Sequence, residues 1–538
     1  MGVSVSSYSC MANMSASRWG EATEQDSQSI KSMKGDGACS AKVDEAVEKI
    51  RGKLHSSAVR SVTNQDLQDV QSTIASLPNE DASAVMGKLL ESELRDMSNQ
   101  VVRLMSSQAS DFDEYDEYVT SNDKEDKKTF FDTMAQKLDG KQLARMTNAF
   151  EGNSLGSAEN VKALGCSIAE HAGDDVKLEY ILALKDRKVL ADQSWVVGTI
   201  QGDSIWKWSD PQAQAAARVI VGIGDPAKAK LALEKLETEE LNAVIRASAD
   251  PTVEANDNNN PFFSYDTASF QKLMQTAAKM KAEVQTPEEI KDVADLKARI
   301  FNAAVDVLKD AESDCFADTA AIRKGINDVL MSDVNGVMTE LSSSSEASSG
   351  KRMAIYAKSV INAGEYTLLS DIQVRLVLGN DLNGNYKDRF NHQEYRRACA
   401  CMDYVNALNL GYFVGAMDAA MTSITSDANK QVEIVNAVIS TAATVVAVPL
   451  SPLSSAGVTV GATGNSEVVK YFYNKIVSEK SDAVTKLRQA TTLPFVIVGQ
   501  RKNGELYTER ADKGGAFSRF EDTWSLIKDS AVREMAKP

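Results

Sequence analysis

The sequence predicts a mainly α-helical protein: an irregular multi-helical body, then a C-terminal helical domain with an apolar hairpin and one small β-hairpin. Three observations predict this fold class. Apolar residues recur at helical spacing through most of the chain, proline follows capping residues at several places, and no fixed repeat length is present. The 538 residues are 43% hydrophobic and 25% charged, which is typical of a globular protein with more than one domain.

Residues 1–40 are rich in Ser, Gly and other small residues, and we expect a flexible leader there. They contain no basic segment followed by an apolar one, so we expect no Sec-type signal. Six cysteines are scattered over the whole chain rather than grouped in a disulfide framework. These features predict a protein that is cytoplasmic in the cell that makes it and leaves, if at all, by another route.

Residues 41–341 are predicted to form the α-helical body. Asp225-Pro226, Ser209-Asp210-Pro211 and Thr286-Pro287 each place a capping side chain before a proline, which is typical of the first turn of a helix. Two interruptions are expected: a short hairpin over Trp195–Trp208, and a polar loop from Asp250 to Pro261.

The Ser-rich stretch 342–350 is predicted to be a linker, and 351–538 a C-terminal α-rich domain. Near its end, Pro494–Val498 and Glu505–Tyr507 flank an Asn-Gly pair, which supplies the positive φ of a tight turn. We therefore predict a β-hairpin over residues 495–508.

The strongest functional signal is an uncharged run of 33 residues, 434–466. Val432–Val448 is long enough for one apolar helix of about 25 Å, close to the thickness of a bilayer core. Pro449 and Pro452 then predict a turn, and the second arm, 453–463, is shorter and rich in Ser, Thr and Gly.

A second uncharged run precedes it, from Tyr404 to Met417. Gly411 and Gly415 have the Gly-x-x-x-Gly spacing that lets two helix backbones approach closely. The whole segment 404–464 is thus either a hairpin that inserts into a membrane or the permanent apolar core of the C-terminal domain. Asp418 and Asp427 favour the core, because charges are costly inside a bilayer.

The charge distribution excludes one class of function and leaves another open. The net charge of −17 has the wrong sign for a protein that follows a phosphate backbone, so no nucleic-acid partner is expected. Residues 430–538 nevertheless carry 14 Lys and Arg against 11 Asp and Glu. A mildly basic segment favours contact with anionic lipid.

No motif indicates an enzyme, a cofactor or a metal site. Ser154 has the spacing of a hydrolase nucleophile elbow, but the preceding segment is helical rather than a strand. The turn at Asp381 lacks the glycine and acidic positions of a calcium loop, and Cys399 and Cys401 lack the usual two-residue gap. The chain holds only three histidines, far apart in sequence.

The polar leader, the helical body with segments such as Leu138-Asp139-Gly140-Lys141-Gln142-Leu143, and the apolar Ala/Val/Ser/Gly hairpin together resemble large bacterial competition toxins. These are effectors without a signal peptide that type VI-like secretion machinery delivers, some of which depolarise membranes. The resemblance implies three partners: target-cell membrane lipid, a component of the secretion apparatus and an immunity protein.

Two main functional hypotheses follow, and a third, an enzyme with an unfamiliar site, would need a pocket lined by convergent polar groups. In the first, the chain is a secreted effector toxin that is soluble before delivery and perturbs a target-cell membrane through residues 404–464. In the second, it is a non-enzymatic helical scaffold or interaction protein.

Overall fold

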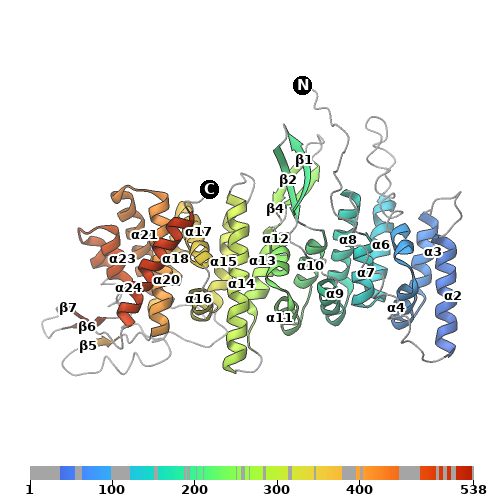
Figure 1. Cartoon of the computed structure of the whole chain (residues 1–538), viewed down its shortest axis with the longest axis horizontal. Helices are drawn as coiled ribbons and strands as arrows, with labels where there is room; N and C mark the ends of the chain where they lie inside the picture. The colour runs from blue at the N-terminus through green and yellow to red at the C-terminus, as the bar shows by residue number, and fades with distance from the viewer. Residues whose placement is uncertain are drawn as a thin grey trace.

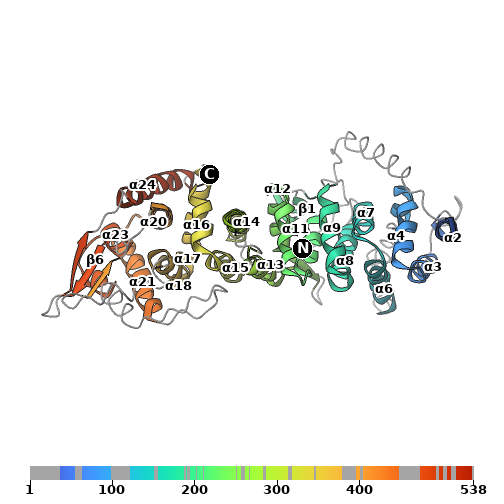
Figure 2. The same cartoon turned by 90° about the horizontal axis from the view of Figure 1, so that it is seen from below.

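The computed structural model describes residues 37–54, 64–97, 121–150, 155–186, 190, 194–200, 203–209, 211–249, 251–255, 261–265, 267–282, 286–312, 318–343, 347–378, 396–399, 404–447, 473–491, 496–500, 506–510 and 516–535. Most of these residues are helical, which confirms the mainly α fold class. Figures 1 and 2 show an elongated stack in which the helices follow one another along the long axis, broadly in sequence order.

Among the described residues, seven helices form the first part of the stack: α2 (Gly37–Leu54), α3 (Asn64–Ala75), α4 (Asn79–Lys88), α6 (Ser121–Lys137), α7 (Gly140–Phe150), α8 (Leu155–His171) and α9 (Asp174–Asp186). Each helix packs on helices close to it in sequence, such as α3 on α6 and α7 on α9. Apolar residues at helical spacing, such as Val43, Val47 and Ile50, are buried between them. Helix α2 begins at Gly37, inside the predicted leader, and the rest of the leader lies outside the described residues.

The middle of the stack holds α10 (Pro211–Val221), α11 (Pro226–Lys235), α12 (Thr238–Ser248), α13 (Thr267–Lys279), α14 (Pro287–Glu312), α15 (Thr319–Ser332) and α16 (Val334–Ser343). The three predicted proline starts are confirmed, at Pro211, Pro226 and Pro287. The Asp225 carboxylate accepts a hydrogen bond from the Ala227 backbone N–H at 2.9 Å, so it caps α11 as its position in the sequence indicates.

Polar side chains of α9 contact the segment between α10 and α11. Asp174, at the start of α9, accepts hydrogen bonds from the backbone N–H groups of Gly224 (3.2 Å) and Asp225 (2.8 Å). Lys177 donates to the carbonyl oxygen of Gly222 at 2.6 Å, just beyond the end of α10. Burial raises the pKa of Asp174, but these backbone hydrogen bonds and the Lys177 charge outweigh it and hold the pKa below its usual value.

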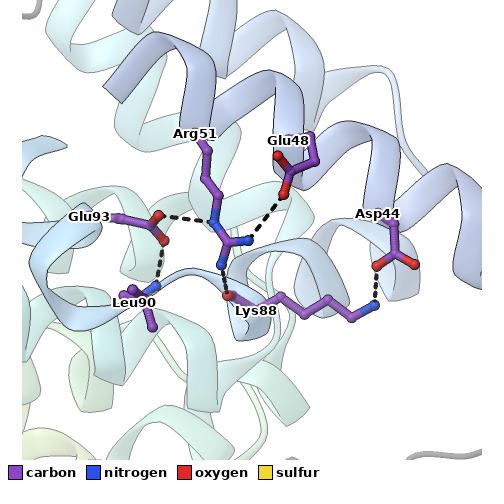
Figure 3. A network of polar contacts seen from close by, with 6 residues as sticks. All are labelled: Asp44, Glu48, Arg51, Lys88, Leu90 and Glu93. Atoms are coloured by element: carbon purple, nitrogen blue, oxygen red, sulfur yellow. Dashed lines mark hydrogen bonds and ion pairs between the residues drawn. The ribbon is translucent and has the colours of Figure 1, made fainter. Parts of the chain in front are cut away.

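Arg51 of α2 binds the C-terminal end of α4, as Figure 3 shows. Its guanidinium donates to the Lys88 carbonyl oxygen at 3.0 Å, to Glu93 at 2.9 Å and to Glu48 at 3.2 Å. Glu93 is 1% exposed at its side chain and also accepts from the Leu90 backbone N–H at 2.6 Å. A helix end leaves carbonyl groups without partners, and a cation is favoured there.

Arg145 of α7 binds the same helix end from the other side. Its guanidinium donates to the carbonyl oxygens of Met86 (2.9 Å), Gly87 (3.3 Å) and Leu89, and to the Glu91 carboxylate at 2.8 Å. The last carbonyls of α4 are therefore satisfied by two arginines from two different helices. These contacts join α2, α4 and α7.

Within the described residues, two β-hairpins interrupt the helices between α9 and α13, and Figure 1 shows β1, β2 and β4 together on one side of the stack. Strands β1 (Ser194–Ile200) and β2 (Asp203–Ser209) are antiparallel, with Trp195 opposite Trp208, which confirms the first predicted hairpin. The second differs from the prediction. Part of the expected polar loop is strand β3 (Pro251–Ala255), which pairs with β4 (Pro261–Tyr265). The apolar residues that complete this hairpin follow Pro261, outside the stretch taken as a loop.

The C-terminal part contains α17 (Ala347–Ala363), α18 (Tyr366–Leu378), α20 (Tyr404–Ile424), α21 (Ala428–Ala447), α23 (Ala483–Thr491) and α24 (Ala516–Met535). The predicted hairpin near the end is confirmed by the antiparallel strands β6 (Val496–Gln500) and β7 (Leu506–Arg510). A strand that was not predicted, β5 (Arg396–Cys399), pairs with the other edge of β6.

The Ser-rich stretch 342–350 is helical at both ends, because α16 continues to Ser343 and α17 begins at Ala347. Residues 344–346 of the predicted linker lie outside the described residues. Helices α14 and α16 pack against α17, and α16 also packs against α20. One cluster of buried apolar side chains extends from Val43 to Ala531, across this point.

Candidate functional site

Helix α20, which holds the upstream uncharged run of the predicted apolar segment 404–464, lies inside the C-terminal helices. Every residue from Asn409 to Met421 is buried. The neighbours of α20 are α16, α17, α18 and above all α24. A helix that is apolar on all sides needs cover on all sides, and here other helices of the same chain supply it.

Gly411 and Gly415 mark the contact between α20 and α24. A Cβ atom on Gly411 would stand 2.6 Å from the Phe520 carbonyl oxygen, and one on Gly415 would stand 2.7 Å from the Trp524 carbonyl oxygen. Such distances are shorter than real Cβ contacts, so α24 lies where only glycine leaves room for it. The predicted close approach of two helix backbones is present, and the partner helix is α24.

Asp418 is the one charged residue of α20, and it is 4% exposed. Its Oδ2 atom accepts a hydrogen bond from Trp524 Nε1 at 3.0 Å and lies 2.9 Å from Lys528 Nζ. Both donors come from α24. A buried carboxylate is tolerated when it is paired and hydrogen-bonded, so α24 supplies what makes this charge acceptable in an otherwise uncharged helix.

Asn409 is a second polar residue in this helix, and α16 satisfies it. Its side-chain amide donates to the Asn335 carbonyl oxygen (3.3 Å) and to the Thr339 hydroxyl (2.9 Å). Its side-chain oxygen accepts from the Ser342 hydroxyl at 2.8 Å. Thus α20 is anchored on two sides by polar contacts as well as by apolar packing.

The arm predicted over Val432–Val448 is described as far as Ala447, and the second arm, 453–463, lies outside the described residues. Val432 is half-buried in α21, and it packs against the edge of the core. Helix α21 makes its main contacts with α18 and α23 rather than with α20. The other candidate residues for membrane insertion, Val448, Pro449 and Pro452, lie outside the described residues, as does the rest of the segment up to residue 464.

Within the described part of the chain, no helix has both the length and the apolar content needed to cross a membrane.

The described residues also contain no group of three or more His, Cys, Asp or Glu side chains placed to hold a metal ion. A surface cavity of about 510 Å³ lies beside the α20–α21 connection, and its charged lining residues, Lys430 and Glu433, are exposed. Cys399 lies in β5, whereas Ser154, Asp381 and Cys401 fall outside the description.

The residues that complete the α20–α24 contact were not predicted. Trp524 and Lys528 are four residues apart, so they share one face of α24. That spacing indicates a common face but does not identify Asp418, 106 residues before Trp524, as the partner.

Comparison with known proteins finds no protein-family model that matches this chain and no curated protein with significant sequence similarity. The fold defines an architecture: an elongated, irregular α-helical stack with a central apolar helix in its C-terminal part.

Proposed function

We propose that this chain is a non-enzymatic helical scaffold or interaction protein, and that its apolar segment is permanent core. The observation that carries the proposal is the contact of Gly411 and Gly415 with the main chain of α24. The glycine spacing that favours helix association in a membrane is used here inside the chain. An elongated helix stack offers a long surface for partners, as helical repeat proteins do.

A second candidate is a delivered effector that perturbs a target-cell membrane, with lipid, a secretion component and an immunity protein as partners. Its support is that α20 has one charged residue and that the uncharged run beginning in α21 extends to residue 466. In this candidate α24 has to leave α20 before α20 meets lipid. Separation costs the Asp418 contacts and the close glycine packing.

Vesicle leakage tests the two candidates. The purified chain is mixed with anionic vesicles that hold a self-quenching dye, and the same chain is produced in the bacterial cytoplasm with a voltage-sensitive dye present. The scaffold proposal expects no dye release and an unchanged membrane potential. Release that rises with protein concentration, together with depolarisation, would overturn it in favour of the effector.

Two variants make the comparison sharper. Gly415→Leu forces α24 away from α20, whereas Arg145→Met weakens the distant α4–α7 contact. If α20 acts on membranes, Gly415→Leu increases dye release and Arg145→Met does not. If α20 is permanent core, both variants lower stability and neither releases dye beyond the parent protein.

A further inference from the structure

The contact between α20 and α24 repeats itself along the helices. Gly411 lies against Phe520, and Gly415, four residues later, lies against Trp524, also four residues later. Because both residue numbers rise together, the two helices run parallel. The two glycines of α20, one turn apart, thus each lie against the carbonyl group of an aromatic residue of α24. Phe520 and Trp524 are themselves neighbours, with ring centroids 5.6 Å apart.

The two glycine contacts do not by themselves select one register, because each places a main-chain carbonyl group of α24 against a glycine of α20. If α24 slid by one turn, about 5.4 Å, Phe520 would take the place of Trp524 against Gly415. Rows of side chains spaced by four residues recur along a helix, so ridges and grooves would still match. One-turn shifts of one helix past another are a known kind of conformational change.

Asp418 distinguishes the registers. In the observed register, its Oδ2 atom accepts a hydrogen bond from Trp524 Nε1 and forms an ion pair with Lys528 Nζ. A slide in one direction brings Phe520, which has no donor, to the position of Trp524. A slide in the other direction brings Val532 to the position of Lys528. Either shift removes one of the two partners of a carboxylate that is 4% exposed.

We propose that Asp418 determines the register of α24 on α20, and that without it α24 populates a register shifted by one turn. A single buried polar group is known to fix register in packed helices at some cost in stability. The register of α24 on α20 is a property of this helix contact and does not depend on which proposed function is right.

Two other contacts of α24 restrict its register on α20 less strongly. Glu521 pairs with Arg488 of α23, but the two side chains are 36% and 51% exposed, and exposed pairs contribute little. Gly350 of α17 lies beside Ile527, an apolar side chain that carries no hydrogen-bonding group. Asp418 supplies a buried polar contact whose two donors depend on register.

Paired cysteines test the proposal in a full-length chain whose six native cysteines are replaced by alanine. A Cβ on Gly350 would stand 3.8 Å from Ser530 Oγ, so Gly350→Cys with Ser530→Cys reports the observed register. Gly350→Cys with Leu526→Cys, or with Glu534→Cys, reports a shift of one turn in either direction. Disulfide formation under mild oxidation is measured for each pair.

With Asp418 present, we expect the 350–530 disulfide to dominate. In Asp418→Leu, the 350–526 or 350–534 disulfide should rise at least tenfold, which corresponds to about 1.4 kcal/mol at 25 °C. The matched control is Asp522→Leu, on the exposed side of α24, which should keep the parent pattern. A folded Asp418→Leu protein that forms the 350–530 disulfide alone would overturn the proposal.

A second variant covers the case in which Asp418→Leu does not fold. Asp418→Asn combined with Trp524→Phe removes the charge and one donor with little change in shape. The same rise in a shifted disulfide is expected, and the 350–530 disulfide alone would again overturn the proposal.

Discussion

Gly415 of α20 lies directly against the main chain of α24 at Trp524, where a Cβ atom would stand 2.7 Å from the carbonyl oxygen. This relationship gives the Gly-x-x-x-Gly spacing a use within the chain. The two glycines bring α24 close enough for its Trp524 and Lys528 side chains to reach Asp418. The close approach of the α20 and α24 backbones and the pairing of Asp418 thus occur in the same helix–helix contact.

A methyl group at Gly415 should weaken this contact. We expect Gly415→Ala to lower the free energy of unfolding by about 1–3 kcal/mol, because the main chain of α24 has to move away. Urea unfolding followed by circular dichroism measures the change. Gly52→Ala in α2 is the matched control, since nothing lies within 4 Å of a Cβ there, and alanine there should be neutral or stabilise by up to about 1 kcal/mol. Equal effects of the two substitutions would contradict the packing described.

Removal of the guanidinium from Arg145 should loosen α4. Arg145→Met removes the donor to the carbonyls of Met86, Gly87 and Leu89, while Arg51 stays on the Lys88 carbonyl, and we expect a loss of about 2–3 kcal/mol. Arg145→Lys should recover only part of it, because a single ammonium group cannot reach several carbonyls at once. Hydrogen exchange of residues 79–97 is the measurement. Lys141→Met, whose side chain is 74% exposed, serves as the control and should leave exchange unchanged.

The stability contributed by Asp174 should depend on pH. Its folded-state pKa is lowered, so its contribution is present above the unfolded-state pKa and is lost as the pH falls through the folded-state value. We expect Asp174→Asn to cost about 1 kcal/mol at pH 7 and progressively less below about pH 4. Thermal unfolding from pH 7 to pH 3 measures the difference. The neighbouring Asp175, whose side chain is 88% exposed, is the comparison, and Asp175→Asn should show a much smaller effect.

Local sequence signals predicted the local structure well. The proline starts at Pro211 and Pro226 and the Asn-Gly hairpin depend on residues adjacent in sequence, and all are confirmed. Contacts between distant residues were not predicted. The partner of Gly411 and Gly415 lies about a hundred residues later, and many amphipathic helices could have filled that place. Strand β5 is four residues long, and its pairing with β6 has no signal within the strand itself.

The same reason explains what was missed at the α4 end. Arg51 and Arg145 are unremarkable within their own helices, and their role arises only when α2 and α7 flank α4. The functional alternatives remain separate from the fold for a similar reason. An apolar helix covered by its own chain and one stored for insertion have the same sequence pattern.

Hydrogen exchange with and without lipid tests the central claim, that α20 is permanent core, most directly. The full chain is labelled in buffer and in the presence of anionic vesicles, and the amides of residues 407–421 are followed. We predict that these amides are among the slowest to exchange and that vesicles leave their protection unchanged. If vesicles instead remove the protection of residues 407–421 and of α24, while α7–α9 remain protected, α20 is not permanent core.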